Sequence, residues 1–201
     1  MTQITHVIPA AGASRRMGDR DKLLEPVDGL PLLRVVAERA LAVNEDVIVT
    51  LPDLTHPRAK VLNGLAVRQI AVPDAGDGMS ASLRRAASAV SQEAEGVMIL
   101  PADMPDITED DLRQVLQAFE DASGEFLVQA TGADGTPGHP VIFPADLIAE
   151  FKSLSGDEGA RAIVHANRTR LIRVALPSDH ALTDLDSPDA WTLWRANNPD
   201  R

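Results

Sequence analysis

The segment from Ile8 to Lys22 holds the residue types best suited to binding a polyphosphate. A short apolar stretch leads into a loop of small residues that carries several cations, IPAAGASRRMGDRDK. Small side chains allow backbone N–H groups to approach phosphate oxygens, and Arg16 and Lys22 supply the opposing charge. Neither the dinucleotide fingerprint G-x-G-x-x-G nor the G-K-[ST] ending of a P-loop occurs in this segment. The sequence therefore predicts a phosphate-binding loop of a different type.

Asp103 is the second residue whose surroundings suggest a chemical role. It follows an apolar run and lies between Pro101 and Pro105, which stiffen the turn. A carboxylate there can bind Mg²⁺, which prefers oxygen ligands and commonly takes one or two protein carboxylates together with phosphate oxygens. The alternative is that Asp103 only begins a turn. We favour the metal role because a phosphate loop followed by an acidic strand end is how metal-assisted nucleotidyl transfer is assembled.

Asp184 and Asp186 form a further acidic pair near the end of the chain. They occupy alternate positions, so their side chains share one side if the segment is extended. Asp186 is therefore a candidate second Mg²⁺ ligand, with Asp184 as the alternative. A structural interpretation competes with this one, in which Asp186 or Ser187 caps a helix that begins at Pro188. The two interpretations are compatible.

The segment GDGMSAS before the next helical pattern suggests a nucleotide contact. Gly78 permits a close approach of the backbone, and Ser80 or Ser82 could donate to a ribose or a base. Simple capping of the helix by Ser80 explains the same pattern equally well. The acidic run after Thr108 is interpreted as a helix start, with Thr108 as the cap and the acids in the first turn.

Two later segments contain polar residues with open roles. His139, in GHPV, could act as a base or contact an acceptor, and a structural histidine is an equal alternative. Asp157 is a natural helix cap, and Arg161 follows one turn later.

Short β-type runs alternate with amphipathic stretches of helical length, which predicts an α/β fold with parallel strands joined by crossover helices. The predicted strands are 7–9, 46–51, 67–72, 96–100, 126–130 and 171–176, and the predicted helices are 31–43, 80–91, 108–122 and 157–166. Active sites in such folds gather at the carboxyl ends of strands, where 10–22 and 101–106 both fall. The stretch 131–138 is predicted to be a mobile loop from its Gly, Thr and Pro content.

Composition limits the class of protein. With 201 residues, a single domain covering 1–201 is expected. The net charge of −11 argues against a nucleic-acid partner, and the absence of Cys excludes thiol chemistry. No apolar stretch is long enough to span a membrane, and no basic leader precedes one at the N-terminus. We therefore expect a cytoplasmic protein without a membrane partner.

Several segments, taken in order, resemble one family. These segments are 10–22, 78–83, 101–105, 138–141, 156–161 and 184–188, and they span nearly the whole chain. The set is similar to the molybdenum cofactor cytidylyltransferase branch of the MobA-like nucleotidyltransferases. Pro9 departs from the Leu of that signature and resembles the methylerythritol-phosphate cytidylyltransferases instead, although those enzymes have Pro-Lys-Gln where this chain has Asp21-Lys22-Leu23.

The resemblance implies a Rossmann-like three-layer α/β/α sandwich with a mostly parallel sheet, of the nucleotide-diphospho-sugar transferase type. It also implies an enzyme that uses Mg²⁺ to transfer CMP from CTP to molybdopterin-bound molybdenum, with a molybdenum hydroxylase as a possible recipient of the product. The resemblance pairs Ala-Ala-Gly with CTP and Ala-Gly-Gly with GTP. The alternatives are GTP as the donor, another phosphorylated acceptor, or a non-catalytic carrier of the cofactor.

The resemblance also assigns residues to roles. Arg16 and Lys22 would hold the β- and γ-phosphates, and Asp103 would coordinate Mg²⁺. The remaining implied nucleotide contacts are Ala10, Ala11, Gly12, Ser14, Gly78, Ser80 and Ser82, and the implied acceptor contacts are His139, Asp157 and Arg161.

Overall fold

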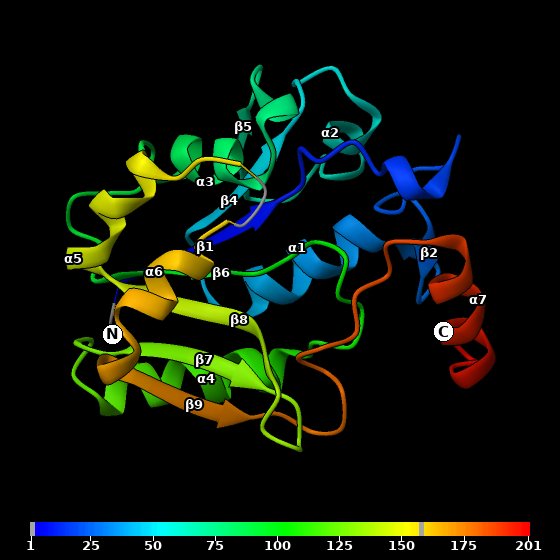
Figure 1. The fold of residues 1–201 in the computed structure, drawn as a ribbon. Coiled ribbons are helices and arrows are strands. Elements are labelled where there is room, and N and C mark those ends of the chain that lie inside the picture. Colours follow the sequence, from blue (N-terminus) through cyan, green and yellow to red (C-terminus); the bar gives the residue numbers. More distant parts are fainter. Residues whose placement is uncertain (1–2, 157–158) are drawn as a thin grey trace.

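A seven-stranded mixed sheet forms the centre of the fold, with strand order β5-β4-β1-β6-β8-β7-β9 (Figure 1). The computed structural model describes residues 3–156 and 159–201. The strands are β1 (Ile4–Pro9), β4 (Val47–Leu51), β5 (Arg68–Ala71), β6 (Gly96–Ile99), β7 (Leu127–Thr131), β8 (Pro137–Pro144) and β9 (Leu171–Ala175). A two-stranded hairpin, β2 (Pro26–Val27) and β3 (Leu30–Pro31), lies outside the sheet. The predicted α/β fold is confirmed.

Helices cover both faces of the sheet because its strands are apolar on both faces. The helices are α1 (Leu32–Val43), α2 (Pro57–Val61), α3 (Met79–Ala87), α4 (Glu109–Asp121), α5 (Ala145–Ile148), α6 (Arg161–Ala166) and α7 (Pro188–Asn197). Successive strand residues point to opposite faces. Ile8 of β1 accordingly packs in one core cluster with α1, α4 and α7, whereas Val7 packs in another with α3, α5 and α6. The result is the three-layer α/β/α arrangement.

The sheet is mostly parallel, with one reversal. β1 pairs in parallel with β4 and β6, β4 with β5, and β7 with β9. β8 runs antiparallel between β6 and β7. The sequence pattern did not predict β8, because its Gly and Pro residues give a weak strand signal. Val141 and Phe143 are nevertheless buried in the sheet, so tertiary packing decides the outcome.

The predicted loop at 131–138 is shorter than expected. Thr131 ends β7, and Pro137 already begins β8. Between them, Asp134 accepts hydrogen bonds from the backbone N–H and hydroxyl of Thr136, at 2.9 and 2.8 Å, in a turn that Gly135 completes with φ of +86°. These bonds close a hairpin turn, so the predicted bounds of the loop were wrong, while its mobility stays a prediction.

Two predicted helix caps are confirmed and one is wrong. Thr108 accepts a hydrogen bond from Asp111 N at 3.2 Å and so caps α4, and Ser187 accepts one from Ala190 N at 3.3 Å and so caps α7. Ser80 is not a cap, because α3 begins at Met79 after Gly78, whose φ of +90° suits glycine. Predicted helix ends are otherwise close, although α3 ends at Ala87 rather than 91 and α6 begins only at Arg161.

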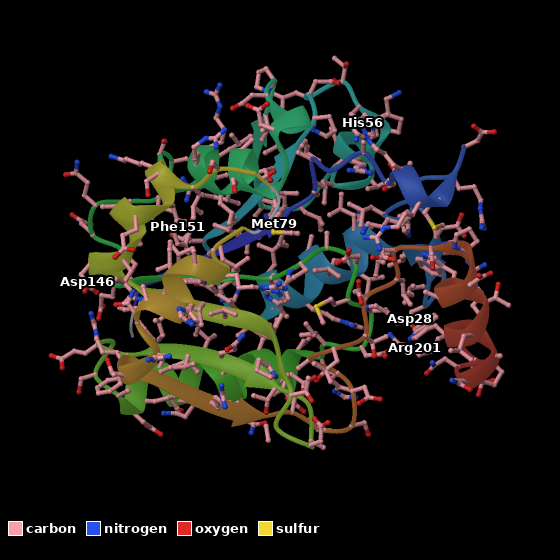
Figure 2. All side chains as sticks on the ribbon, in the orientation of Figure 1. Asp28, His56, Met79, Asp146, Phe151 and Arg201 are labelled. Atoms are coloured by element: carbon pink, nitrogen blue, oxygen red, sulfur yellow. The ribbon has the colours of Figure 1, made fainter. Side chains whose placement is uncertain are left out.

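The C-terminal helix is fixed against the hairpin. Figure 2 shows Asp28 and Arg201 close together beside α7, and their side chains lie 2.9 Å apart. Arg195 of α7 pairs with Glu25 at 2.8 Å. This docking holds the preceding segment, which carries Asp184 and Asp186, in place. Across residues 3–156 and 159–201, each helix is too short or too polar to cross a membrane.

Candidate active site

A cleft of about 880 Å³ opens at the carboxyl ends of the central parallel strands. Its walls come from the loop after β1, the turn after β6 and the segment before α7. Because β1 and β6 are neighbours in the sheet, their two loops lie side by side, as the sequence predicted. The residues that line it include 9–16, 18–23, 52, 56, 58, 75, 76, 78, 79, 82, 101–103 and 186. Two of these lining residues, His56 and Met79, are labelled in Figure 2.

Two cation–carboxylate pairs stand in this cleft. Lys22 Nζ forms an ion pair with Asp103 Oδ2, and both side chains are largely sheltered from solvent. Arg16 Nη2 lies 2.6 Å from Asp186 Oδ2, with the arginine side chain 73% exposed and the aspartate only 17%. The four residues predicted to carry the chemistry are therefore brought together from three distant parts of the chain.

Negative charge is concentrated where the two acidic segments meet. The backbone N–H of Leu185 donates to Asp103 O at 2.9 Å, which draws the segment 184–186 against the turn after β6. Burial raises the pKa of Asp184, and the nearby carboxylates of Asp186 and Asp103 raise it further. In the described part of the chain, no three His, Cys, Asp or Glu side chains form a ready-made metal shell. A divalent ion here would therefore need substrate oxygens beside the carboxylates, as Mg²⁺ commonly does.

Most of the predicted nucleotide contacts line this cleft. Ala10, Ala11, Gly12, Ser14, Gly78 and Ser82 all do so. Ala11 is 3% exposed and packs with Val72 and Ala81, so its Cβ is part of a wall of small side chains. Ser80 is fully buried, and its Oγ has no hydrogen-bond partner among the residues that the structure describes.

Two of the predicted acceptor contacts, His139 and Arg161, are not part of the lining of the cleft. His139, in β8, is mostly buried, and burial lowers its pKa. The negative charge of Asp103 raises this pKa, whereas the positive charge of Arg161 lowers it further. Its Nδ1 has no partner within residues 3–156 and 159–201. Arg161 is exposed at the start of α6. Asp157 lies outside the described residues.

Sequence reasoning missed Arg58, which the structure places against the loop that follows β1. Arg58 is 2% exposed, and its guanidinium bonds to Asp21 and to the carbonyls of Ala10 and Gly12. An arginine in a short polar helix carries no local signal of burial, because its partners lie more than thirty residues away in the chain.

Comparisons with known proteins agree with this geometry. Residues 6–171 match the family model of the MobA-like NTP transferase domain. The chain is 28% identical to the purine catabolism protein PucB of Bacillus subtilis, over 94% of each chain. It is 29% identical to a probable molybdenum cofactor guanylyltransferase of Natronomonas pharaonis, over 93% of this chain and 87% of that protein.

Solved structures with the same fold are also similar to this chain in sequence. Rv0371c from Mycobacterium tuberculosis superposes with a TM-score of 0.80 at 27% identity, covering 96% of this chain and 97% of that one. The same protein has also been solved as a complex with manganese, with a TM-score of 0.78, 26% identity and the same coverage. The family match covers most of this chain and includes the loop after β1 and the turn after β6, two of the three segments that form the walls of the cleft. This chain therefore belongs to the MobA-like NTP transferase family of nucleotidyltransferases.

Proposed function

We propose that the protein transfers CMP from CTP to the terminal phosphate of molybdenum-bound molybdopterin and releases pyrophosphate. The observation that carries this proposal is the alternation of charge in the cleft, where Arg16 and Lys22 each face a carboxylate, Asp186 and Asp103. A triphosphate donor needs cations for its oxygens and carboxylates for the metal that accompanies it. Both sets of groups lie within one cleft here.

Asp103 and Asp186 fit a hard divalent cation. Both are carboxylates with limited exposure, 19% and 17%, at the meeting point of two acidic segments. The raised pKa of Asp184, caused by burial and then by Asp186 and Asp103, indicates a surplus of negative charge there. The manganese complex of Rv0371c supports a divalent ion in this family. Bound Mg²⁺ would neutralise phosphate oxygens and so make the α-phosphorus more open to attack.

The cations of the cleft perform the rest of the chemistry. When CTP binds, its β- and γ-phosphate oxygens replace the carboxylates as partners of Arg16 and Lys22. The acceptor phosphate attacks the α-phosphorus in line, and the two cations neutralise the charge that develops on the leaving pyrophosphate. A phosphate nucleophile is already ionised at neutral pH, so positioning matters more than a general base. We propose His139, Asp157 and Arg161 as the contacts for the acceptor. The charges of Asp103 and Arg161 both act on His139, which supports a position of His139 near the reacting groups.

The wall of the cleft supports a pyrimidine donor. Ala10-Ala11-Gly12 matches the pattern that accompanies CTP. Ala11 lines the cleft and packs with Val72 and Ala81, and we propose that glycine at this position would leave more room for the base. A guanylyltransferase acting on the same cofactor is the second candidate, supported by the relative from Natronomonas pharaonis. A carrier without catalysis is disfavoured, since a carrier has no need of a metal carboxylate beside two phosphate-binding cations.

A donor and acceptor matrix tests the proposal. The purified protein is incubated with Mg²⁺, with CTP or GTP, and with either molybdenum-bound molybdopterin or an alcohol phosphate. Pyrophosphate release and the mass of the product are then measured. We expect turnover only with CTP and the molybdenum cofactor. Turnover with GTP would show that the donor assignment is wrong, and turnover with the alcohol phosphate would show that the acceptor assignment is wrong. No turnover with any pair would contradict the proposal.

A further inference from the structure

Arg58 is the most completely bonded buried cation near the cleft. It lies on α2, between β4 and β5, far in sequence from the loop that it contacts. An arginine has five N–H donors, and each of them has a partner here. Nε and Nη2 donate to the two carboxylate oxygens of Asp21, both at 2.7 Å. Nη1 donates to Ala10 O at 2.6 Å and to Gly12 O at 2.7 Å, and Nη2 also donates to Ser14 Oγ at 2.9 Å.

The bonds to the two carbonyls fix the direction of the neighbouring amides. In a trans peptide, the C=O of one residue points opposite to the N–H of the next. With the carbonyls of Ala10 and Gly12 held by Arg58, the N–H groups of Ala11 and Ala13 point away from the guanidinium. Both residues line the cleft, and neither amide donates to another backbone group in the portion of the chain described. They are therefore free to donate to phosphate oxygens.

The bonds to Asp21 fix the other end of the loop. Asp21 also accepts a hydrogen bond from Leu23 N at 3.0 Å, so the backbone on both sides of Lys22 is held. Burial opposes ionisation of Asp21, but the hydrogen bond and charge of Arg58, together with the Leu23 N–H and His56, keep the pKa of Asp21 below its ordinary value. Asp21 is consequently ionised at neutral pH. The side chain of the next residue, Lys22, pairs with Asp103.

We propose that Arg58 is a positioning residue that presets the phosphate-binding loop, through its bonds to Ala10, Gly12 and Asp21, for the triphosphate of the donor nucleotide. This inference rests on the proposed function, because it assigns a role within the same site. Arg58 does not itself contact the nucleotide in this scheme. Its effect is to hold two amide donors and Lys22 in place before the substrate arrives, which lowers the ordering cost of binding.

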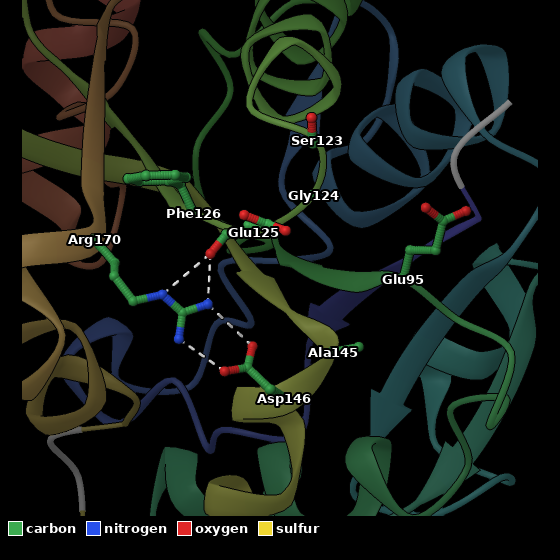
Figure 3. Close-up of a pocket in the computed structure, with 8 residues that line it drawn as sticks. All are labelled: Glu95, Ser123, Gly124, Glu125, Phe126, Ala145, Asp146 and Arg170. Carbon is green, nitrogen blue, oxygen red and sulfur yellow. Dashed lines mark hydrogen bonds and ion pairs between the residues drawn. The ribbon is translucent and has the colours of Figure 1, made fainter.

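The opposite edge of the sheet offers a matched control. Arg170 there also bonds a carboxylate and a carbonyl, since its guanidinium contacts both carboxylate oxygens of Asp146 and the carbonyl of Glu125 (Figure 3). It lines a separate pocket of about 590 Å³, together with Glu95 and Phe126, and none of the predicted site residues lines that pocket. Replacing Arg170 disturbs the same type of contact without touching the phosphate-binding loop.

The test compares Arg58→Lys, Asp21→Asn and Arg170→Lys with the wild type. Titration with CTP and with GTP, each with Mg²⁺, gives the dissociation constant, steady-state rates give KM for donor and acceptor, and thermal unfolding monitors the fold. We expect Arg58→Lys and Asp21→Asn to weaken binding of the preferred nucleotide at least fivefold and to raise its KM, with little change in the KM of the acceptor. Arg170→Lys should bind nucleotide as the wild type does.

The outcomes separate the two proposals. Nucleotide affinity within fivefold of the wild type in the folded variants would overturn the role of Arg58, as would an equal loss in Arg170→Lys. If Arg58→Lys does not fold, Asp21→Asn decides the question, because it breaks the same anchor from the loop side. A wild type that binds neither CTP nor GTP would overturn the proposed function and this inference together. A wild type that binds and turns over while the variants match it would overturn this inference alone.

Discussion

At the scale of single residues, the four side chains proposed to carry the chemistry form two ion pairs, each joining groups from distant parts of the chain. Lys22 faces Asp103, and Arg16 faces Asp186. Lys22, Asp103 and Asp186 are largely sheltered from solvent, whereas the Arg16 side chain is 73% exposed. In the sheltered Lys22–Asp103 pair, each charge offsets part of the desolvation of its partner. Two of the predictions at this scale replace one member of the Lys22–Asp103 pair and measure the effect on turnover.

We expect Asp103→Asn to reduce turnover by at least about a hundredfold while the fold survives, because the change keeps the shape and removes the charge that would hold Mg²⁺. Turnover is measured against Mg²⁺ concentration, with circular dichroism as the check on folding. Asp110→Asn is the control, since Asp110 is 95% exposed on α4. Activity within about threefold of the wild type, with unchanged Mg²⁺ dependence, would show that Asp103 only forms a turn.

Lys22→Ala should lower kcat/KM for the nucleotide by about ten- to a hundredfold, since one charged hydrogen bond contributes roughly 1.5 to 3 kcal/mol. The change also leaves Asp103 without its partner, so the fold is checked by thermal unfolding. Lys152→Ala, at an exposed position remote from the cleft, is the control. If Lys22→Ala raises only the KM of the acceptor, the triphosphate lies elsewhere.

The donor base is tested at Ala11. We expect the wild type to prefer CTP over GTP by at least about tenfold in kcat/KM, and Ala11→Gly to reduce that preference. The reason is that a steric clash between the larger purine and a packed wall costs more free energy than the loss of a single methylene contact. Competition kinetics with both nucleotides measure the ratio. Equal use of the two nucleotides by the wild type would reject the cytidylyltransferase proposal without touching the family assignment.

At the scale of elements, the sequence predicted those strands and helix ends that neighbouring residues determine. Apolar runs predicted most strands of the sheet, and Thr108 and Ser187 were recognisable as helix caps from their own neighbours. β8 was missed because its burial comes from β6 and β7 on either side, not from its own composition.

The site follows the same division between local and distant signals. Arg16, Lys22 and Asp103 are identifiable from the loops that carry them. Arg58 is not, because all of its partners belong to a distant segment. The burial of the Ser80 side chain has no local signal either, since it depends on where α3 packs.

The cap of α4 gives a prediction about stability. Thr108 and Asp111 form a reciprocal capping box, in which Asp111 Oδ2 also accepts a hydrogen bond from Thr108 N at 2.8 Å. Thr108→Ala should lower the free energy of unfolding by about 1 kcal/mol and leave the nucleotide KM unchanged. Urea unfolding measures the former, with Thr192→Ala on α7 as the control. A change below about 0.3 kcal/mol would mean that Asp111 alone satisfies the helix start.

At the scale of the whole molecule, a net charge of −11 surrounds a cleft in which cations gather. Arg15, Arg16, Arg20 and Lys22 all line it. The same lining also carries Asp19, Asp21, Asp103 and Asp186, so the cations are interleaved with carboxylates. A cluster of cations confined to a cleft in an acidic protein favours small polyanions over extended ones such as nucleic acids, because a long polyanion would also meet the surrounding negative charge. The same central strand that carries this loop, β1, also carries a histidine in the interior of the fold.

That histidine, His6, makes the stability of the whole fold depend on pH. Its side chain is fully buried, and burial lowers its pKa from 6.5 to about 4, although Asp46 opposes part of the shift. In the unfolded chain, His6 becomes protonated as the pH falls through about 6.5, whereas in the folded chain it stays neutral until about pH 4. Between these two pH values, acid therefore favours the unfolded state. From pH 7 to pH 5, this one group should lower the free energy of unfolding by about 2 kcal/mol.

Urea unfolding at pH 7, 6 and 5 measures this dependence in the wild type, in His6→Gln and in His165→Gln, whose histidine is exposed on α6. His6→Gln should be less stable than the wild type at pH 7, because it changes a buried side chain. It should, however, lose about 2 kcal/mol less between pH 7 and pH 5, whereas His165→Gln should follow the wild type. Parallel curves for the wild type and His6→Gln would mean that His6 accepts a proton in the folded protein as readily as in the unfolded chain, and that the strand opens locally to admit water.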